Sequence, residues 1–224
     1  MDRNFKRIFN VKWKCSVRLY SYTPPEYTKY SSEEAFIEIE EELAIFSQNT
    51  KNISIIGEFN SRTSKLNDYI VDILELFDIL DVVDDTDYID NVLNKLEEKN
   101  IPLERYSQDV DRVNKYGTKL LELCKRCNLF IGNDQLFSDQ GIGRTTCKDA
   151  SLVDYLLLSP SFFDIITDFE IVEFDSMFSY VHNRIHFTLS FPKDTTNHDD
   201  TSNTYIPVSN PRVRWNPNKA SEYV

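Results

Sequence analysis

The chain has 224 residues, which is enough for one domain with a sizeable hydrophobic core. Hydrophobic residues make up 41% of it and aromatic residues 13%, a composition that excludes an intrinsically disordered protein. The net charge of −12 is unfavourable for binding a polyanion, so a nucleic-acid partner would require a local basic patch or a metal ion.

The absence of targeting signals and the use of cysteine favour a cytoplasmic or nuclear protein. The basic start, MDRNFKRIFNVKWKC, lacks the apolar stretch of a secretory signal. No apolar run approaches the length of a bilayer span, so no membrane partner is expected. Four cysteines are too few for the disulfide framework of a small secreted domain.

Apolar patterns and turn residues predict an α/β domain over residues 17–191. A strand over Val17–Tyr27 ends at a Pro-Pro turn. The next segment, Ser31–Gln48, has capping-box spacing at its start and apolar residues on one face, which predicts a helix. The uninterrupted apolar run Ile53–Gly57 predicts a strand in the middle of a sheet.

The second part of the domain continues the α/β pattern. The acidic segment Asp68–Glu104 is loosely helical, and a second amphipathic helix is expected over Asp111–Phe130. Four further strands are predicted over Gly143–Cys147, Ser151–Ser159, Phe169–Phe174 and Ile185–Phe191. Residues 1–16 form an unmatched N-terminal segment, and the polar residues 192–224 are expected to be a linker or tail.

Two segments of the predicted helices have both a functional and a structural reading. The acids of Asp68–Glu104 could bind a cation, but they lack the spacing of a metal-binding loop, which favours a solvated insert. Cys124 and Cys127 form a C-x-x-C motif beside apolar residues of the second helix. A core role is favoured over zinc or redox chemistry, because the other two cysteines are isolated. The same helix carries four basic residues whose spacing favours a solvated face over a phosphate contact: Lys115, Lys119, Lys125 and Arg126.

The stretch ISIIGEFNSRT, residues 53–63, places polar side chains at the exit of an apolar strand. Gly57 allows a sharp backbone turn there. Glu58 and Asn60 are two residues apart in an extended chain, so they point to the same side. A carboxylate beside a carboxamide could hold an attacking water and one oxygen of a phosphate.

A carboxylate and a histidine later in the chain could act as a pair. Asp154 interrupts the apolar strand SLVDYLLLS, and a buried carboxylate is costly unless it is paired. It is either an acid that orients a histidine or an edge-strand residue bonded by backbone amides. His182 precedes the last predicted strand and is its natural partner, since the chain has three histidines.

Four stretches, spread from about residue 17 to 191, occur in the order and spacing of a known family: YTPPEY, IIGEFNSRT, RYSQDVDRVNKYGTKLLELCKRCNL and SLVDYLLLS. They resemble the endonuclease/exonuclease/phosphatase superfamily, and most closely the endonuclease-like domains of LINE-type retrotransposons. The tail RVRWNPNKASEY also resembles the segment that follows this domain in such elements. The resemblance implies a four-layer α/β/β/α sandwich, of which this chain carries mainly the second half.

The resemblance also implies Mg²⁺-dependent hydrolysis of phosphodiesters, with DNA as the ancestral substrate. Tyr22 and Asn60 match phosphate-contacting positions. Glu58 matches the acid that orients the attacking water, which is normally Asp in the family, and it is the one metal ligand expected here. Asp154 matches the acid that orients the histidine, and His182 matches the catalytic histidine.

Three departures from the family pattern predict a degenerate enzyme. Val181 stands where the family has a metal-side carboxylate, and the metal-binding glutamate expected before the Y-x-P-P strand is unmatched. Glu58 in place of Asp moves the carboxylate by about 1.5 Å, and a misplacement of about 1 Å can cost roughly 100-fold in rate. We therefore expect a truncated, retrotransposon-derived phosphodiesterase domain with little or no activity.

Two alternatives to a degenerate enzyme follow from the same residues. The site could retain a weaker phosphoesterase activity, with a metal held by Glu58 alone. The domain could instead be a non-catalytic interaction module. In that case a protein partner or a homodimer would cover the sheet face that the missing first half leaves open.

Overall fold

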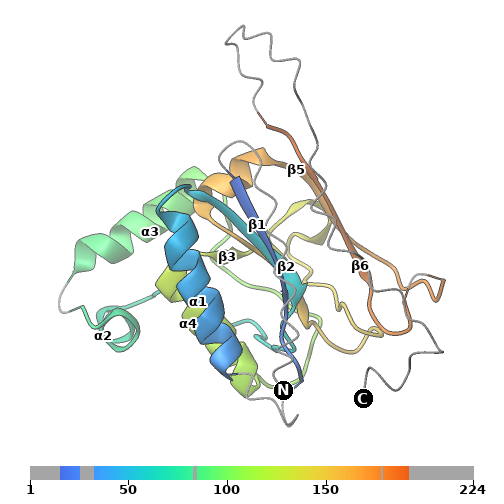
Figure 1. Cartoon of the computed structure of the whole chain (residues 1–224). Helices are drawn as coiled ribbons and strands as arrows, with labels where there is room; N and C mark the ends of the chain where they lie inside the picture. Colours follow the sequence, from blue (N-terminus) through green and yellow to red (C-terminus); the bar gives the residue numbers. More distant parts are fainter. Residues whose placement is uncertain (1–15, 26–32, 83–84, 178, 192–224) are drawn as a thin grey trace, which may run out of the picture. The chain divides into compact units, whose positions relative to one another are not determined.

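The computed structural model describes residues 16–25, 33–82, 85–177 and 179–191 (Figure 1). In chain order its elements are β1 (Ser16–Tyr22), α1 (Glu33–Ser47), β2 (Asn52–Glu58), α2 (Ile73–Leu80), α3 (Thr86–Glu98), α4 (Lys115–Cys127), β3 (Phe130–Ile131), the 3₁₀ helix η1 (Phe137–Asp139), β4 (Asp154–Leu158), the 3₁₀ helix η2 (Pro160–Ile165), β5 (Ile166–Val172) and β6 (Arg184–Leu189). The predicted segments 1–16 and 192–224 lie outside the described residues, apart from Ser16, so the domain boundaries stay predictions.

A four-stranded sheet has the order β1-β2-β4-β3. β1 and β2 run parallel, whereas β4 pairs antiparallel with both β2 and β3. The apolar run of β2 therefore lies between two neighbours, as its sequence predicts. A separate antiparallel pair is formed by β5 and β6.

Both faces of the four-stranded sheet are covered. On one face, Ile55 and Leu157 pack with Phe36 of α1 and Leu120 of α4 in one buried cluster. On the other face, the next residue along each strand enters a second cluster, which includes Leu156 and joins the sheet to the β5–β6 pair. The result is a helix layer, a sheet and a second small sheet (Figure 1). The predicted α/β class is confirmed, and the described residues form the α/β/β part of the predicted sandwich.

The β5–β6 pair has one apolar and one polar face. Phe169 and Ile171 are buried against the larger sheet. Their partners on β6, Phe187 and Ile185, are only partly buried. Glu170 on the outer face is exposed. The apolar face of β6 is thus incompletely covered within the described residues, and a partner for it stays a prediction.

The predicted strand Gly143–Cys147 is wrong. Gly143 has a φ of 67°, and the backbone amides of Thr146 and Cys147 donate to the carbonyl of Ser151 in a tight loop. These bonds replace the ladder of a strand, and Cys147 forms isolated bridges with Ser151 and His182. The neighbouring strand begins at Asp154, not at Ser151 as predicted.

The second long helix is shorter than predicted, because an asparagine closes each end. The side chain of Asn114 accepts a hydrogen bond from the Gly117 amide at 2.7 Å and begins α4. Asn128 takes the left-handed conformation, with φ 51°, and ends it. Asp111 and Phe130, the predicted limits, therefore lie outside the helix.

The acidic segment forms two helices whose caps use its carboxylates. Asp72 accepts from the Glu75 amide at the start of α2, and Asp85 accepts from the Tyr88 amide at the start of α3. Asp68 departs from the expected solvated insert, because it is buried and accepts hydrogen bonds from Arg105 and from the Ile131 amide. These three acids thus have structural roles.

The C-x-x-C motif has the predicted core role. Cys124 is fully buried in the helix-side cluster, and Cys127 packs against it. Burial raises the pKa of the Cys127 thiol to about 12, which keeps it protonated at neutral pH. Three of the basic residues of α4 form ion pairs: Lys119 with Glu122, Lys125 with Glu75, and Arg126 with Glu40. The Lys125 side chain is only 11% exposed, so it departs from the predicted solvated face. Within the described residues, no helix is long and apolar enough to span a membrane.

Candidate active site

Three of the predicted site residues lie in one row across the sheet. The strand register places Tyr22 of β1 opposite Glu58 of β2, and Glu58 opposite Asp154 of β4. Directly opposed residues point to the same face of a sheet. Because Ile56 and Leu156 on that face are packed against β5 and β6, the row lies at the rim of the space between the two sheets.

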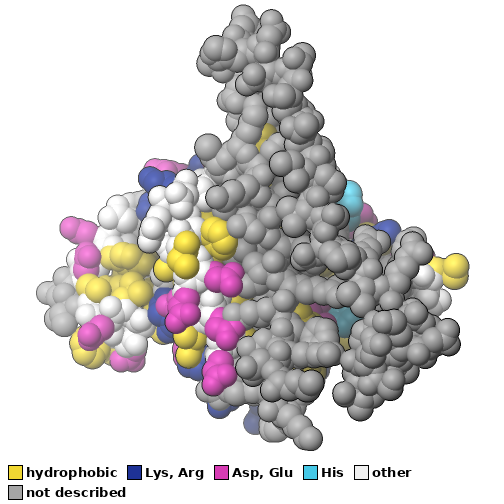
Figure 2. Space-filling model, in the orientation of Figure 1, with side chains coloured by type: hydrophobic (Ala, Val, Ile, Leu, Met, Phe, Trp, Pro, Cys, Tyr) yellow, Lys and Arg dark blue, Asp and Glu magenta, His cyan; other side chains and the backbone are white. Residues whose placement is uncertain are grey.

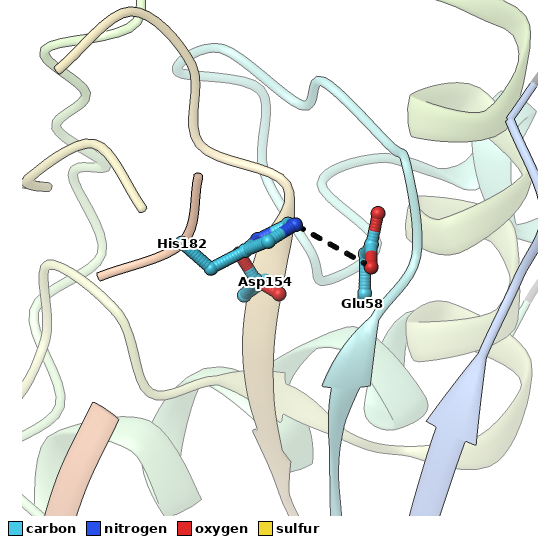
Figure 3. A group of neighbouring side chains, drawn as sticks. All are labelled: Glu58, Asp154 and His182. Atoms are coloured by element: carbon cyan, nitrogen blue, oxygen red, sulfur yellow. Dashed lines mark hydrogen bonds and ion pairs between the residues drawn. The ribbon is translucent and has the colours of Figure 1, made fainter. Parts of the chain in front are cut away.

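His182 completes the group from the segment before β6 (Figure 3). Its Nδ1 lies 2.9 Å from Asp154 Oδ2, and its Nε2 lies 3.6 Å from Glu58 Oε2. An ionised carboxylate only accepts hydrogen bonds, so Asp154 fixes the proton on Nδ1 and leaves Nε2 free to accept. A proton-accepting nitrogen therefore faces the carboxylate of Glu58.

The hydrogen bonds that hold the backbone at Asp154 come from a loop that the sequence does not predict. The Oγ1 of buried Thr146 accepts hydrogen bonds from the amides of Val153 and Asp154. β4 lies between β2 and β3, although β3 pairs only with its Leu157 and Leu158, and the carboxylate of Asp154 contacts His182. The structure favours the orienting pair with His182.

Asn60 lies beside Glu58 but is oriented differently from the prediction. Its φ is 50°, a left-handed conformation that asparagine tolerates, and it turns the chain out of β2. Its side-chain amide donates to Glu58 Oε1 at 3.0 Å and to the carbonyl of Thr23 at 2.7 Å. Both amide hydrogens are thus used within the protein, so Asn60 orients Glu58. The phosphate contact of Asn60 stays a prediction.

Burial dominates the electrostatics of the two carboxylates. It raises the pKa of Glu58, a shift that His182 opposes and Asp154 reinforces. It also raises the pKa of Asp154, against the hydrogen bonds with His182 and Thr146 that lower it. The site therefore holds carboxylates that are partly removed from water and would be stabilised by a positive charge.

The residues present fit a divalent cation. Oxygen or nitrogen atoms of Glu58, Asp154 and His182 lie within 4.8 Å of one another. Asp154 is bonded to His182 through Oδ2 and Glu58 to Asn60 through Oε1, so Glu58 keeps Oε2 as an oxygen that could bind the ion. Mg²⁺ is commonly bound by one or two carboxylates with waters and substrate phosphates, so this donor set suits it.

A pocket of about 290 Å³ adjoins these residues. Glu58, Asn60 and His182 line it, whereas Tyr22 is not among its lining residues and is 42% exposed. Sequence reasoning missed two further lining residues, Arg62 and Asn114. Arg62 stands within the stretch GEFNSRT, and its position two residues after Asn60 was a signal that could have found it.

Comparisons with known proteins identify the fold. No protein-family model and no curated protein matches the chain. The solved structure of the 3′ phosphatase NExo from Neisseria, bound to a product DNA hairpin, is similar with a TM-score of 0.50 and 13% identity, over 85% of this chain and 67% of that one. A structure of the 3′-5′ exonuclease NExo from Neisseria meningitidis is also similar, with a TM-score of 0.49, 14% identity and the same coverage. The chain thus shares its α/β fold with the first of these structures.

Proposed function

We propose that this domain is a slow, metal-dependent phosphoester hydrolase of the endonuclease/exonuclease/phosphatase superfamily that acts on nucleic acid. The observation that carries the proposal is the convergence of Glu58, Asp154 and His182 at the rim between the two sheets. The neighbours of similar fold include a DNA 3′ phosphatase, which supports a nucleic-acid substrate.

The catalytic role of the histidine follows from its hydrogen bond. Asp154 holds the imidazole with the proton on Nδ1, so Nε2 can accept a proton from a water or a hydrogen bond from the substrate. Asp154 also stabilises the imidazolium that forms when Nε2 takes up the proton. Asn60 fixes the carboxylate of Glu58 next to this nitrogen.

Glu58 would hold the divalent cation at the mouth of the pocket. Such a cation, when bound, neutralises the charge that develops on the phosphate oxygens. Burial of Glu58 favours this role, because a desolvated carboxylate gains from a nearby positive charge.

The longer side chain of Glu58 supports the expectation of a slow rate. Its Oε2 lies 3.6 Å from His182 Nε2, so the carboxylate occupies part of the space through which a water or substrate would approach this nitrogen. Val181, where the family has a carboxylate, adds no charge at the site. We propose these two residues as the reasons for reduced activity. The order of the motifs supports an origin from a LINE-type retrotransposon, which in-frame homology in the flanking genomic sequence would test.

The first prediction concerns Glu58→Asp. Shortening the side chain draws the carboxylate away from His182 and brings the site closer to the family pattern, so Mg²⁺-dependent hydrolysis should become faster by about tenfold or more. The measurement is the rate of nicking of supercoiled DNA, with release of phosphate from a 3′-phosphorylated oligonucleotide in parallel. Glu170→Asp, the same change on the exposed outer face of β5, is the matched control and should not alter the rate. If neither wild type nor Glu58→Asp hydrolyses either substrate with Mg²⁺, the proposal fails.

A further inference from the structure

Arg62 brings a positive charge to the pocket. It is the one lysine or arginine among the described residues that line the cavity beside Glu58 and His182. A phosphate that enters here meets the partly buried carboxylate of Glu58 in a protein of net charge −12. Binding of that phosphate therefore depends strongly on the positive charge of Arg62.

The backbone of Arg62 is held by the start of helix α4. Its amide donates to the Asn114 side chain at 2.9 Å, and its carbonyl accepts from the Asn114 amide at 3.3 Å. Gly117 packs so closely that a Cβ there would lie 1.9 Å from the Arg62 carbonyl oxygen. The main chain at Arg62 is thus fixed, and movement is left to the side chain.

The guanidinium of Arg62 lies between two carboxylates of different character. The side chain of Asp109 is 2% exposed, and its Oδ1 lies 3.6 Å from Arg62 Nη1. The amides of Leu152 and Asp111 donate to the Asp109 carboxylate and fix it in place. Asp111 also forms an ion pair with Arg62, but its side chain is 61% exposed. One partner is therefore part of the protein interior, and the other is free to leave into solvent.

The geometry points to Arg62 as the residue that binds the substrate phosphate, with the carboxylate of Asp111 occupying the place of that phosphate in the free protein. The inference rests on the proposed function and adds to it the binding residue and the exchange. Asp109 keeps the guanidinium in position while a phosphate oxygen replaces Asp111. Arginine suits this role because its planar fork can bond two oxygens at once. Asn60, whose amide hydrogens are both used, leaves this role open.

The test is the binding of a fluorescent single-stranded oligodeoxynucleotide, measured by anisotropy at low salt with EDTA, so that neither metal nor hydrolysis contributes. Arg62→Ala should weaken binding by about tenfold or more and reduce the slope of log affinity against log salt by about one. Arg62→Lys should bind with an affinity between those of wild type and Arg62→Ala. Arg112→Ala removes an exposed cation of the neighbouring loop and should change affinity by less than about threefold.

Asp111→Asn tests the exchange itself. Removing the competing carboxylate should tighten binding by about threefold or more, whereas Asp78→Asn, an exposed acid of α2, should not. In the double variant Arg62→Ala/Asp111→Asn the gain should disappear, because the two residues act on one contact. Inorganic phosphate should compete with the oligonucleotide more effectively in Asp111→Asn than in wild type. Thermal unfolding of each variant checks that the fold is retained.

The outcomes separate this inference from the proposed function. Equal affinity and equal KM in wild type and Arg62→Ala, in a protein that hydrolyses DNA, overturn the role of Arg62 and leave the function standing. Binding that depends on Arg62 in a protein without hydrolysis supports the inference and overturns the function. Wild-type protein that binds no oligonucleotide at low salt overturns the inference.

Discussion

At the scale of single residues, the polar side chains of the site each have a defined partner. The apolar runs of β2 and β4 were enough to predict that Glu58 and Asp154 are significant, because Glu58 follows one run and Asp154 interrupts the other. The sequence could not predict that Asn60 would turn its amide toward Glu58 and Thr23, since this depends on a left-handed backbone and on the neighbouring strand β1. The local pattern identifies the residues, and the tertiary contacts decide their orientation.

Asp154→Asn tests how the buried carboxylate of Asp154 affects the stability of the fold. Because burial gives Asp154 a higher pKa in the folded than in the unfolded chain, the folded state binds more protons between the two values. Its ionised form therefore reduces stability as pH rises through that window. We expect Asp154→Asn to unfold at a higher temperature than wild type at pH 7, with a difference that shrinks as pH falls toward 4, the usual pKa of an aspartate, about 3.9.

The measurement for Asp154→Asn is the thermal midpoint between pH 4 and pH 8, followed by circular dichroism. Asp90→Asn, an exposed acid of α3, is the control and should show no such trend. A variant that is less stable than wild type at pH 7 would show that the contact with His182 outweighs the cost of burial.

At the scale of elements, helix α4 positions the loop that carries the site. The 3.6-residue spacing of its apolar side chains predicts its existence, and its ends are set by Asn114 and Asn128. The false strand at Gly143–Cys147 shows the limit of the pattern. Its β-branched residues favour a strand, but Gly143 has a positive φ and Thr146 uses its hydroxyl to hold β4. A short loop with side-chain hydrogen bonds has the same composition as a strand.

Asn114→Ala should destabilise both the helix and the site. The substitution removes the cap of α4 and the bonds to the Arg62 amide and the Asn60 carbonyl. We expect a loss of about 2 kcal/mol in the free energy of unfolding, near the upper end for an N-cap, because more than the cap is lost. Chemical denaturation measures it. Thr118→Ala, an exposed change in the same turn, should cost less than about 0.5 kcal/mol. An unchanged midpoint for Asn114→Ala would refute the role of the cap.

At the scale of the whole molecule, exposed acidic side chains contrast with one buried group of charged residues. Acidic side chains gather over α1 (Figure 2), and most acids of the described residues are exposed. One buried group joins distant segments: Arg105 bonds Asp134 at 2.6 Å and Asp68 at 3.2 Å. Burial opposes the charge of Arg105, and the two carboxylates raise its pKa beyond that effect. No local pattern predicts this network, because its members are 29 and 37 residues apart in the chain.

The two sheets and their helix cover could be predicted in outline from the apolar runs. The pairing of β4 between β2 and β3 could not, because antiparallel and parallel neighbours depend on contacts between segments about 100 residues apart. That pairing is what places Asp154 beside Glu58. The site is therefore a property of the assembled domain, although Glu58, Asp154 and His182 each stand out in the sequence.

The most direct test of the account is the effect of His182→Ala on Mg²⁺-dependent phosphodiester hydrolysis. The wild-type rate should fall by about 100-fold or more, because a general base contributes roughly that amount. His186→Ala, a change to an exposed histidine of β6, should leave the rate as it is. A hydrolysis rate that is the same in His182→Ala and wild type would show that the pair with Asp154 is not the catalytic centre.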